Sequence, residues 1–319
     1  MRTRFVQLAV AVLVLASVAF AADAGEKKVL FIDSYHAGYS WSDGVVKGAK
    51  SVLGDQVELK IIHMDTKRNT SEEFKKQAAE KAKAVIDEFQ PDVVIAADDN
   101  ASKFLIAPYY KGKDLPFVFC GVNWDCSGYG FPAENVTGMI EVSLADKLIE
   151  QLKKYAKGDK VAFLAVDNTT ARKEGQYNKE KLGITFAQEV YVSSVDEWKA
   201  KFKELQGSVD IVILDNNAGL NDWDDAAMKA FHAENTSVPT GSIYDWIAPY
   251  VLLSYTKDAA EQGEWAAAQA LRILEGTSPA AIEVAQNKKA KIFLNLPLAK
   301  QLGVNFPLAM MKRAEIIKK

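Results

Sequence analysis

The chain has few residues of the kinds that build catalytic and metal centres. Its 319 residues include two cysteines and three histidines, and their spacing does not match that of metal ligands. The sequence also lacks a Walker-type phosphate loop (GxxxxGK followed by Ser or Thr), a GxSxG nucleophile turn and an HExxH zinc motif. We therefore expect no catalytic group, no metal and no cofactor.

The chain also lacks a large excess of charge of either sign. The 39 Lys and Arg residues nearly balance the 42 Asp and Glu residues, which gives a net charge of −3, and the charges are mixed along the chain. A protein whose main partner is nucleic acid or an anionic lipid surface usually carries a basic patch. We expect neither partner.

Long apolar runs are absent except at the N-terminus. "MRTRF" carries two arginines, "VQLAVAVLVLASVAF" is apolar, and Ala19 to Ala21 form a small-x-small cleavage site. This order is typical of a secretory signal peptide, which we place at residues 1–22. The cleavage site has no cysteine nearby, so we expect no lipid anchor. The mature protein is expected in the periplasm.

The two cysteines lie close together in the sequence. Cys120 and Cys126 form an even pair in a chain expected to be exported, and oxidising compartments favour disulfides. We expect one disulfide between them. The alternative is two inert thiols, one of them buried on a strand.

What the sequence does contain is an alternation of apolar strands and amphipathic helices. "KKVLFIDS", "DVVIAADDN" and "LPFVFCGVN" are predicted strands separated by predicted helices, and we expect Ser42 to cap the first helix. More than ten strands are predicted, too many for one open sheet. "DVVIAADDN" is echoed later by "DIVILDNNA". We expect an α/β fold of two doubly wound, parallel-sheet lobes.

In sheets of this kind, ligands bind beyond the carboxyl ends of the strands. The first lobe has predicted strand-end turns at residues 34–36, 98–100 and 121–124. The second has them at 167–169, 215–217 and 242–245. If the lobes face each other, these six turns line one cleft.

The chain resembles the type I periplasmic substrate-binding proteins of ABC transporters, in the branch that includes aromatic amino-acid binders. The resemblance is carried by "SYHAGYSW" with Gly48 in the next helix, by "LDNN", and by "YVLLSYTKDAAEQGEWAAAQALRILEGTSPAAIEV" and "KIFLNLPLAKQLGVNFP". It implies a hinge with several crossovers, a ligand between the lobes, and delivery of that ligand to an ABC transporter permease by a monomeric protein. It also implies that residues 27–138 and 250–276 form lobe one, and residues 139–249 and 277–319 form lobe two.

The resemblance further implies which residues contact the ligand. Ser34, Tyr35 and the turn from Asp99 to Ser102 should face it, and Asp215 matches a position where members place an aspartate against the ligand. Two turns depart from the family pattern, "VDNTTARKEG" and "ADDNAS", so the ligand class is not carried over.

The residue types in the six turns favour a cationic ligand group. They hold five aspartates and no lysine, and enclosed opposite charges attract strongly. Aromatic residues nearby can stack on a ligand, and Arg172 can bind a carboxylate. We expect an amine-bearing small molecule, such as an amino acid with an aromatic or apolar side chain. The candidate ligand-binding residues are Ser34, Tyr35, Tyr39, Trp41, Asp99, Asn100, Ala101, Ser102, Asn123, Trp124, Asp167, Asn168, Asp215, Asn216, Tyr244 and Asp245.

Each of these interpretations has an alternative. Aspartate and asparagine at strand ends commonly cap helices, Trp41 and Trp246 can be packing residues, His36 can be a loop residue, and Arg172 can be a solvated charge. An extracytoplasmic sensor of the same fold is the second function considered. The third is an exported hydrolase that uses Asp98 and Asp99.

Overall fold

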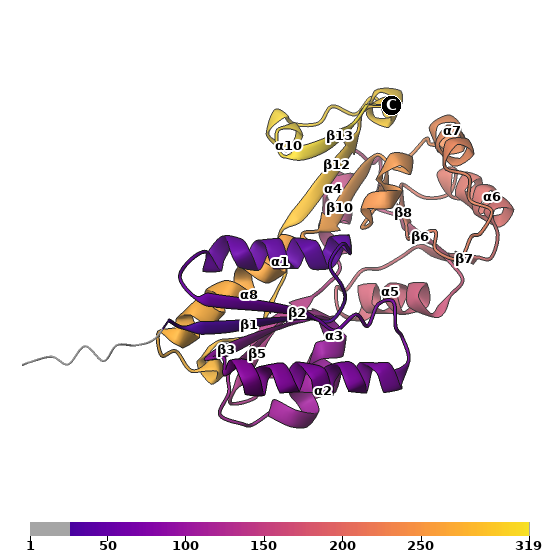
Figure 1. Ribbon diagram of the computed structural model, residues 1–319. Helices are drawn as coiled ribbons and strands as arrows, with labels where there is room; N and C mark the ends of the chain where they lie inside the picture. Colours follow the sequence, from indigo (N-terminus) through magenta and orange to yellow (C-terminus); the bar gives the residue numbers. More distant parts are fainter. Residues whose placement is uncertain (1–25, 319) are drawn as a thin grey trace, which may run out of the picture.

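The computed structural model describes residues 26–318, and the expected signal peptide at residues 1–22 lies outside them. Within this range, no helix combines the length and the apolar character of a membrane span. The chain forms two bodies, each built on its own sheet, with a waist between them (Figure 1). The body that contains β1 is called lobe one, and the body that contains β6 is called lobe two.

Lobe one is built on a six-stranded sheet in which every pairing is parallel. Side chains of β1 alternate between its faces: Val29 and Phe31 pack in one core, and Leu30 and Ile32 pack in the other. The strands, in sheet order, are β11 (Ala285–Gln286), β5 (Val136–Glu141), β4 (Phe117–Asn123), β3 (Val93–Ala97), β1 (Lys28–Asp33) and β2 (Glu58–His63).

Helices cover both faces of the lobe-one sheet, as expected for parallel strands. One face packs against α1 (Ser40–Leu53) and α8 (Ala259–Leu274). The other packs against α2 (Glu72–Phe89) and the π-helix η1 (Ser102–Tyr110), which continues the short helix α3 (Asp98–Ala101). Two 3-10 turns, η2 (Ser127–Tyr129) and η4 (Pro279–Ala281), complete the lobe.

Lobe two is built on a seven-stranded sheet. Its pairings are parallel except that β12 is antiparallel to β10. The strands, in sheet order, are β13 (Ala314–Ile317), β12 (Ala290–Asn295), β10 (Leu253–Lys257), β9 (Thr240–Ser242), β8 (Ile211–Leu214), β6 (Val161–Val166) and β7 (Gln188–Val192).

The lobe-two sheet is also covered on both faces. One core includes residues of α4 (Ala145–Lys153), α5 (Thr169–Glu180) and α9 (Leu296–Leu302), with α10 (Leu308–Met311) at its edge. The other includes residues of α6 (Val195–Gln206), α7 (Asp225–Asn235) and the 3-10 helix η3 (Asp245–Tyr250). The predicted doubly wound α/β architecture is therefore present in both lobes.

The chain crosses between the sheets after β5, after β10 and after β11. These points differ from the boundaries expected at residues 138, 250 and 276. β5 pairs with β4 through Glu141, and β10 pairs with β9 and β12, so residues 253–257 belong to the lobe-two sheet. The physical reason is burial: Leu252 and Leu253 complete an apolar core of lobe two.

The cysteines are free, which corrects the expected disulfide. Cys120 and Cys126 are both buried as thiols. Cys120 packs on the sheet face covered by α1 and α8, whereas Cys126 packs in the core on the opposite face. The sheet separates the two sulfur atoms, and a disulfide requires Cβ atoms about 4 Å apart.

Candidate functional site

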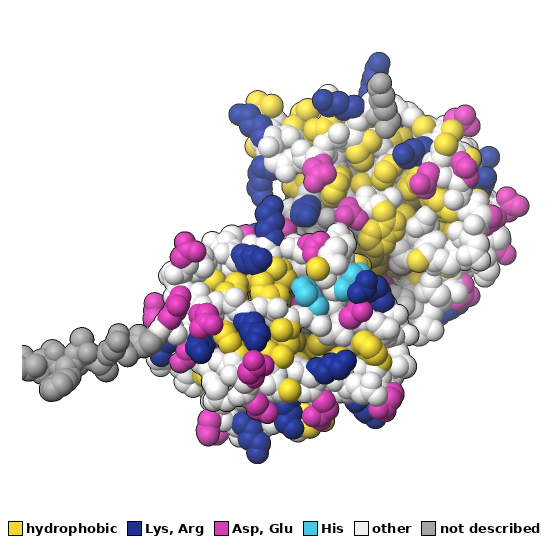
Figure 2. Space-filling model, viewed as in Figure 1, with side chains coloured by type: hydrophobic (Ala, Val, Ile, Leu, Met, Phe, Trp, Pro, Cys, Tyr) yellow, Lys and Arg dark blue, Asp and Glu magenta, His cyan; other side chains and the backbone are white. Residues whose placement is uncertain are grey.

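A cavity of about 360 Å³ lies between the two lobes. Figure 2 shows the waist between two rounded bodies, with acidic and basic side chains interspersed over the visible face. Lobe one, including the residues at which the chain leaves or enters it, contributes Tyr35, Tyr39, Ser40, Trp41, Lys67, Asp98, Asn123, Glu141 and Ala259. Lobe two contributes Ile243, Tyr244, Asp245, Trp246, Thr256, Lys257 and Lys291.

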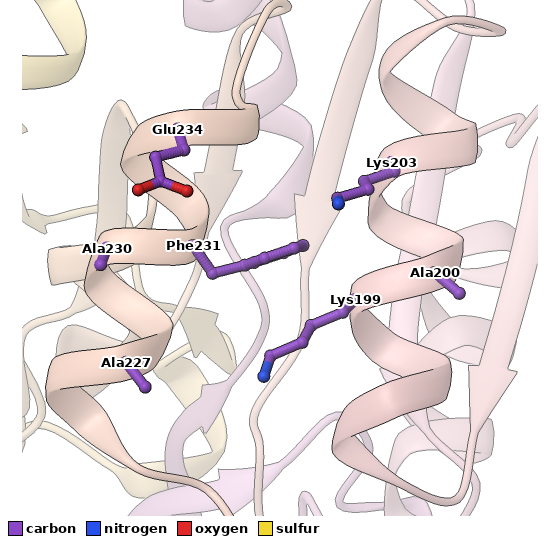
Figure 3. A pocket seen from close by; sticks show the side chains of 7 residues that line it. All are labelled: Lys199, Ala200, Lys203, Ala227, Ala230, Phe231 and Glu234. Atoms are coloured by element: carbon purple, nitrogen blue, oxygen red, sulfur yellow. The ribbon is translucent and has the colours of Figure 1, made fainter.

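A second hollow, of about 650 Å³, lies between α6 and α7 on lobe two (Figure 3). Phe231 points from α7 into this groove, and Lys199 and Lys203 of α6 point toward it (Figure 3). Their ammonium groups lie 5.9 and 5.5 Å from the centre of the Phe231 ring. These contacts join one helix to the other, and the groove is lined by residues of these two helices without any strand-end turn, so the cavity between the lobes is the stronger candidate site.

Aromatic rings from both lobes line the cavity. In lobe one, Tyr35 and Tyr39 meet edge to face with ring centres 5.4 Å apart, and the Lys67 ammonium lies 5.0 Å from each centre. In lobe two, the rings of Tyr244 and Trp246 lie 4.7 Å apart. Trp246 is 53% exposed, an unusual position for so large an apolar side chain. The cavity therefore offers stacking surfaces on two opposing walls.

Asp98 brings a buried carboxyl to the lobe-one wall. It follows β3 with a φ of 70°, an uncommon conformation for a residue other than glycine. The Trp41 indole N–H donates to its Oδ1 at 3.2 Å, whereas its buried Oδ2 has no hydrogen-bond partner among residues 26–318. The pKa of Asp98 is held well above its ordinary value, mainly by burial and secondly by the negative charge of Glu141.

An ion pair between Lys257 and Glu141 lies on the inner wall. Burial by itself lowers the pKa of Lys257, but the carboxylates of Glu141, Glu174 and Asp98 raise it above its ordinary value. The same acidic surroundings act on Tyr35, whose pKa is raised by burial and by Asp98. The protein's own carboxylates thus stabilise the positive charge of Lys257.

Two further carboxyls, Glu174 and Asp215, lie deep on the lobe-two side. Asp215 follows β8 and is 1% exposed, and burial together with the charge of Glu174 raises its pKa to about 7. Burial also raises the pKa of Glu174. The charge of Lys257 and hydrogen bonds with the side chains of Ser143 and Trp124 lower it, but by less. Neither Glu174 nor Asp215 lines the cavity itself, but each acts electrostatically on a residue that does, Glu174 on Lys257 and Asp215 on Tyr244.

Six of the predicted ligand-binding residues line the cavity together, and each lies at the end of a strand or at the start of a helix. They are Tyr35, Tyr39, Trp41, Asn123, Tyr244 and Asp245. Trp41 has both of the roles considered for it, since it packs in the lobe-one core and also lines the cavity.

Four predicted residues lie behind the wall. Ser34 is fully buried, and its hydroxyl donates to the Ala97 carbonyl and accepts from the Ala101 N–H. Ala101 and Ser102 are also fully buried, and Asn100 donates to the Thr66 hydroxyl at 2.8 Å. This turn is therefore used to join β1, β3 and α3.

The remaining predicted polar residues bond mainly within the protein. Asp99 accepts from Tyr129 at 2.7 Å and from the Asn123 side chain at 2.6 Å. Asp167 pairs with Arg172, Asn168 caps α5 and Asn216 donates to Asp215. Trp124 contacts Tyr177 across the lobes with ring centres 5.1 Å apart. The capping alternative considered for the aspartates and asparagines therefore describes Asn168, whereas Asp99, Asp167 and Asn216 bond to neighbouring side chains.

Ser42, expected to cap the first helix, has another role. α1 begins earlier, at Ser40, with Tyr39 at its N-cap and no side-chain cap. The Ser42 hydroxyl donates instead to buried Asp33 at 2.8 Å, and His63 bonds to the other oxygen of that carboxylate at 2.8 Å. No group of three or more His, Cys, Asp or Glu side chains in the described residues has a metal-site arrangement.

The charged residues Glu141 and Lys257 of the inner wall, and Glu174, which acts on Lys257, are not among the residues predicted from the sequence. Glu141 and Lys257 are the last residues of β5 and β10, where an apolar run ends in a charge. That signal was present in the sequence. Glu174 lies within α5 among other charged residues, so its burial has no sequence signal.

The comparisons with known proteins agree with this geometry. The family model described as "ABC transporter substrate binding protein" matches residues 32–318. A search of the curated proteins found no match.

Three solved structures share the fold at low sequence identity. The ligand-free, open structure of a substrate-binding protein with adhesive properties from Clostridium difficile is 17% identical, with a TM-score of 0.69, over 92% of this chain and 99% of that one. The ABC domain in complex with L-Trp from Streptococcus pneumonia is 18% identical, with a TM-score of 0.55, over 92% and 100%. The periplasmic ribose ABC transporter structure from Conexibacter woesei is 14% identical, with a TM-score of 0.53, over 88% and 96%.

The family match spans both lobes and all three crossovers, and the solved structures share the two-lobed architecture. The chain belongs to the ABC transporter substrate-binding protein family.

Proposed function

We propose that the protein captures an amine-bearing small molecule in the periplasm and delivers it to an ABC transporter permease. The ligand class proposed is an amino acid with an aromatic or apolar side chain. The observation that carries the proposal is the cavity itself, in which aromatic rings from both lobes surround buried carboxyls. The similar structure of the ABC domain in complex with L-Trp supports the same ligand class.

The cavity provides a place for each part of such a ligand. The unpartnered Oδ2 of Asp98 and the lobe-two carboxyls suit an ammonium group. Lys67 and the first turn of α1, which has no side-chain cap, suit a carboxylate. Tyr35, Tyr39 and Trp246 suit an aromatic or apolar side chain.

The test is a thermal-shift panel of L-tryptophan, L-tyrosine, L-phenylalanine and L-leucine. Each amino acid is compared with the matched acid that lacks the amine, such as indole-3-propionate for L-tryptophan. A ligand present at 100 times its Kd stabilises the folded state by about 2.7 kcal/mol, which raises the melting temperature measurably. Stabilisation by anions or neutral sugars alone would contradict the proposal.

Asp215→Ala is the variant that tests the lobe-two contact. It is expected to weaken binding of the best panel ligand by at least roughly tenfold, because a charged hydrogen bond contributes about 1.5–3 kcal/mol. Isothermal titration calorimetry measures the affinity, and circular dichroism checks that the variant is folded. Unchanged affinity would remove Asp215 from the site.

A further inference from the structure

Lys67 lines the cavity between the lobes, although it lies outside the six strand-end turns. It belongs to the loop between β2 and α2, and its ammonium lies 5.0 Å from the ring centres of both Tyr35 and Tyr39. The two rings meet edge to face, 5.4 Å apart. A cation this close to two aromatic rings is attracted by both of them. The side chain of Lys67 is otherwise exposed, so these rings hold its charge at the cavity wall.

The loop that carries Lys67 is fastened to the turn after β1, from which Tyr35 comes. The backbone N–H of Asp65 donates to the Tyr35 carbonyl at 2.6 Å. The Asp65 carboxylate accepts from the Arg68 guanidinium at 2.6 and 2.9 Å and from the Asn69 amide at 3.0 Å. A bidentate pair of this kind is geometrically specific. Lys67 is therefore presented to the cavity by a loop that is bonded on both sides of it.

The charge of Lys67 is not used by an acid of the protein. Within residues 26–318 its ammonium makes no ion pair, and the nearest acid along the chain, Asp65, is paired with Arg68. Lys257, which lines the same cavity, is by contrast paired with Glu141. Charge-assisted hydrogen bonds between an ammonium and a carboxylate are among the strong contacts available to a ligand. Lys67 can make such a bond without giving up another one.

We propose that Lys67 is a specificity-determining residue, which selects ligands that carry a carboxylate beside the amine and disfavours amines that lack one. The inference rests on the proposed capture of an amine and narrows the substrate class to zwitterionic amino acids. The acidic residues of the lining, Asp98, Glu141 and Asp245, favour cations of any kind. Lys67 adds the discrimination, because its ammonium attracts a ligand carboxylate and repels a ligand whose positive charge is not offset.

The test is calorimetry with two matched series of compounds. One series is L-tryptophan, tryptamine and indole-3-propionate, and the other is L-phenylalanine, 2-phenylethylamine and 3-phenylpropionate. Within each series the ring is constant, and the amino acid is compared with the amine alone and with the acid alone. The wild-type protein is expected to bind the amino acid at least roughly tenfold more tightly than the amine, because a hydrogen bond to a charged group is lost with the carboxylate.

Lys67→Met removes the charge from the cavity wall. The variant is expected to bind the amino acid at least roughly tenfold more weakly and to bind the amine as well as the wild type does, or better. Lys67→Arg keeps the positive charge and should retain most of the preference, which separates the charge from the packing of the side chain. An unchanged ratio of amino-acid to amine affinity in Lys67→Met would overturn the proposal.

Two further lysines serve as controls. Lys103 of η1 is exposed, lies 5.0 Å from the ring centre of Phe104 and is outside the cavity lining, so Lys103→Met should bind all six compounds as the wild type does. Lys291 of β12 lines the cavity from lobe two. If Lys291→Met loses the preference for the amino acid and Lys67→Met keeps it, the carboxylate binds to lobe two and the assignment to Lys67 is wrong.

The acids keep this inference separate from the proposed function. If the wild type binds the acid as tightly as the amino acid, and Lys67→Met weakens both, the proposed capture of an amine fails and the role of Lys67 stands. If the wild type binds the amine as tightly as the amino acid, capture of an amine stands and the role of Lys67 fails. Binding of none of the six compounds would overturn both.

Discussion

The ammonium group of Lys257 is paired with the carboxylate of Glu141, and the two residues end strands of different sheets. Glu141 is the last residue of β5 in lobe one, and Lys257 is the last residue of β10 in lobe two. Two of the three crossovers begin directly after them. The pair therefore links the lobes at the point where the chain passes between them, and it also lines the cavity.

Lys257→Met is expected to destabilise the protein by about 3 kcal/mol, because it leaves the Glu141 carboxylate buried without a cation. Urea unfolding measures the loss, and the double variant Lys257→Met with Glu141→Gln should recover part of it. The control is Lys289→Met, which breaks a more exposed pair with Glu264 at another crossover. That change should cost less than about 1 kcal/mol. Equal losses in the two single variants would show that the inner pair has no special role.

Gly263→Ala is expected to destabilise lobe one by at least about 2 kcal/mol. α1 and α8 approach so closely at this point that a Cβ on Gly263 would collide with the backbone carbonyl of Val45. The matched control is Gly207→Ala at the end of α6, where a Cβ would meet nothing closer than 3.8 Å. Thermal unfolding of both variants checks the difference, and similar melting temperatures would contradict the close packing of the two helices.

His232 is expected to make the protein acid-sensitive. It is fully buried, its Nε2 accepts from the Trp198 indole N–H at 3.3 Å, and burial lowers its pKa from 6.5 to about 3. The unfolded chain binds a proton at His232 below about pH 6.5, whereas the folded chain does not, so this contribution to stability is present above pH 6.5 and is lost as the pH falls toward 3. The loss amounts to roughly 3 kcal/mol at about pH 4.

Urea unfolding at pH 7 and at pH 4 measures this effect. His232→Gln keeps an acceptor for Trp198 but has no titratable group, so the variant should lose less stability than the wild type between the two pH values. The difference between the two proteins isolates His232 from the carboxyls that titrate in the same range. An identical pH dependence would contradict the assignment.

The fold was largely predictable from the sequence because its strands are continuous apolar runs and each is followed by polar turn residues. β3 and β8 illustrate this, since each ends directly before an aspartate, Asp98 or Asp215, that the structure buries. The crossovers were harder. The run at residues 251–257 has the pattern of a strand in either lobe, and only its pairing with β9 and β12 assigns it to lobe two.

Part of the cavity lining was predictable because it follows directly from strand ends. Tyr35 and Tyr244, each two residues beyond the end of a strand, line the cavity as expected. Ser34 was misplaced because a residue directly after a strand can point into the cavity or back under the turn, and its hydroxyl is used between Ala97 and Ala101. Glu174 was missed because its burial depends on how the lobes meet, which no local pattern records.

Trp246→Ala is expected to weaken amino-acid binding without a loss of stability. The side chain is 53% exposed and lies tilted against the ring of Tyr244 in the cavity lining, so its removal leaves no hole in a core. Its stacking or cation–π contact with a ligand contributes about 0.5–2 kcal/mol, which corresponds to a roughly two- to thirtyfold loss of affinity.

The matched control is Leu308→Ala, a truncation of another large apolar residue that is 68% exposed and lies on α10, outside the cavity lining. Calorimetry with the best panel amino acid should show reduced affinity for the Trp246 variant and unchanged affinity for the Leu308 variant. Both proteins should melt at the wild-type temperature in the absence of ligand. If the two variants bind equally well, Trp246 makes no contact with the ligand, and the aromatic surface that recognises it is confined to lobe one and Tyr244.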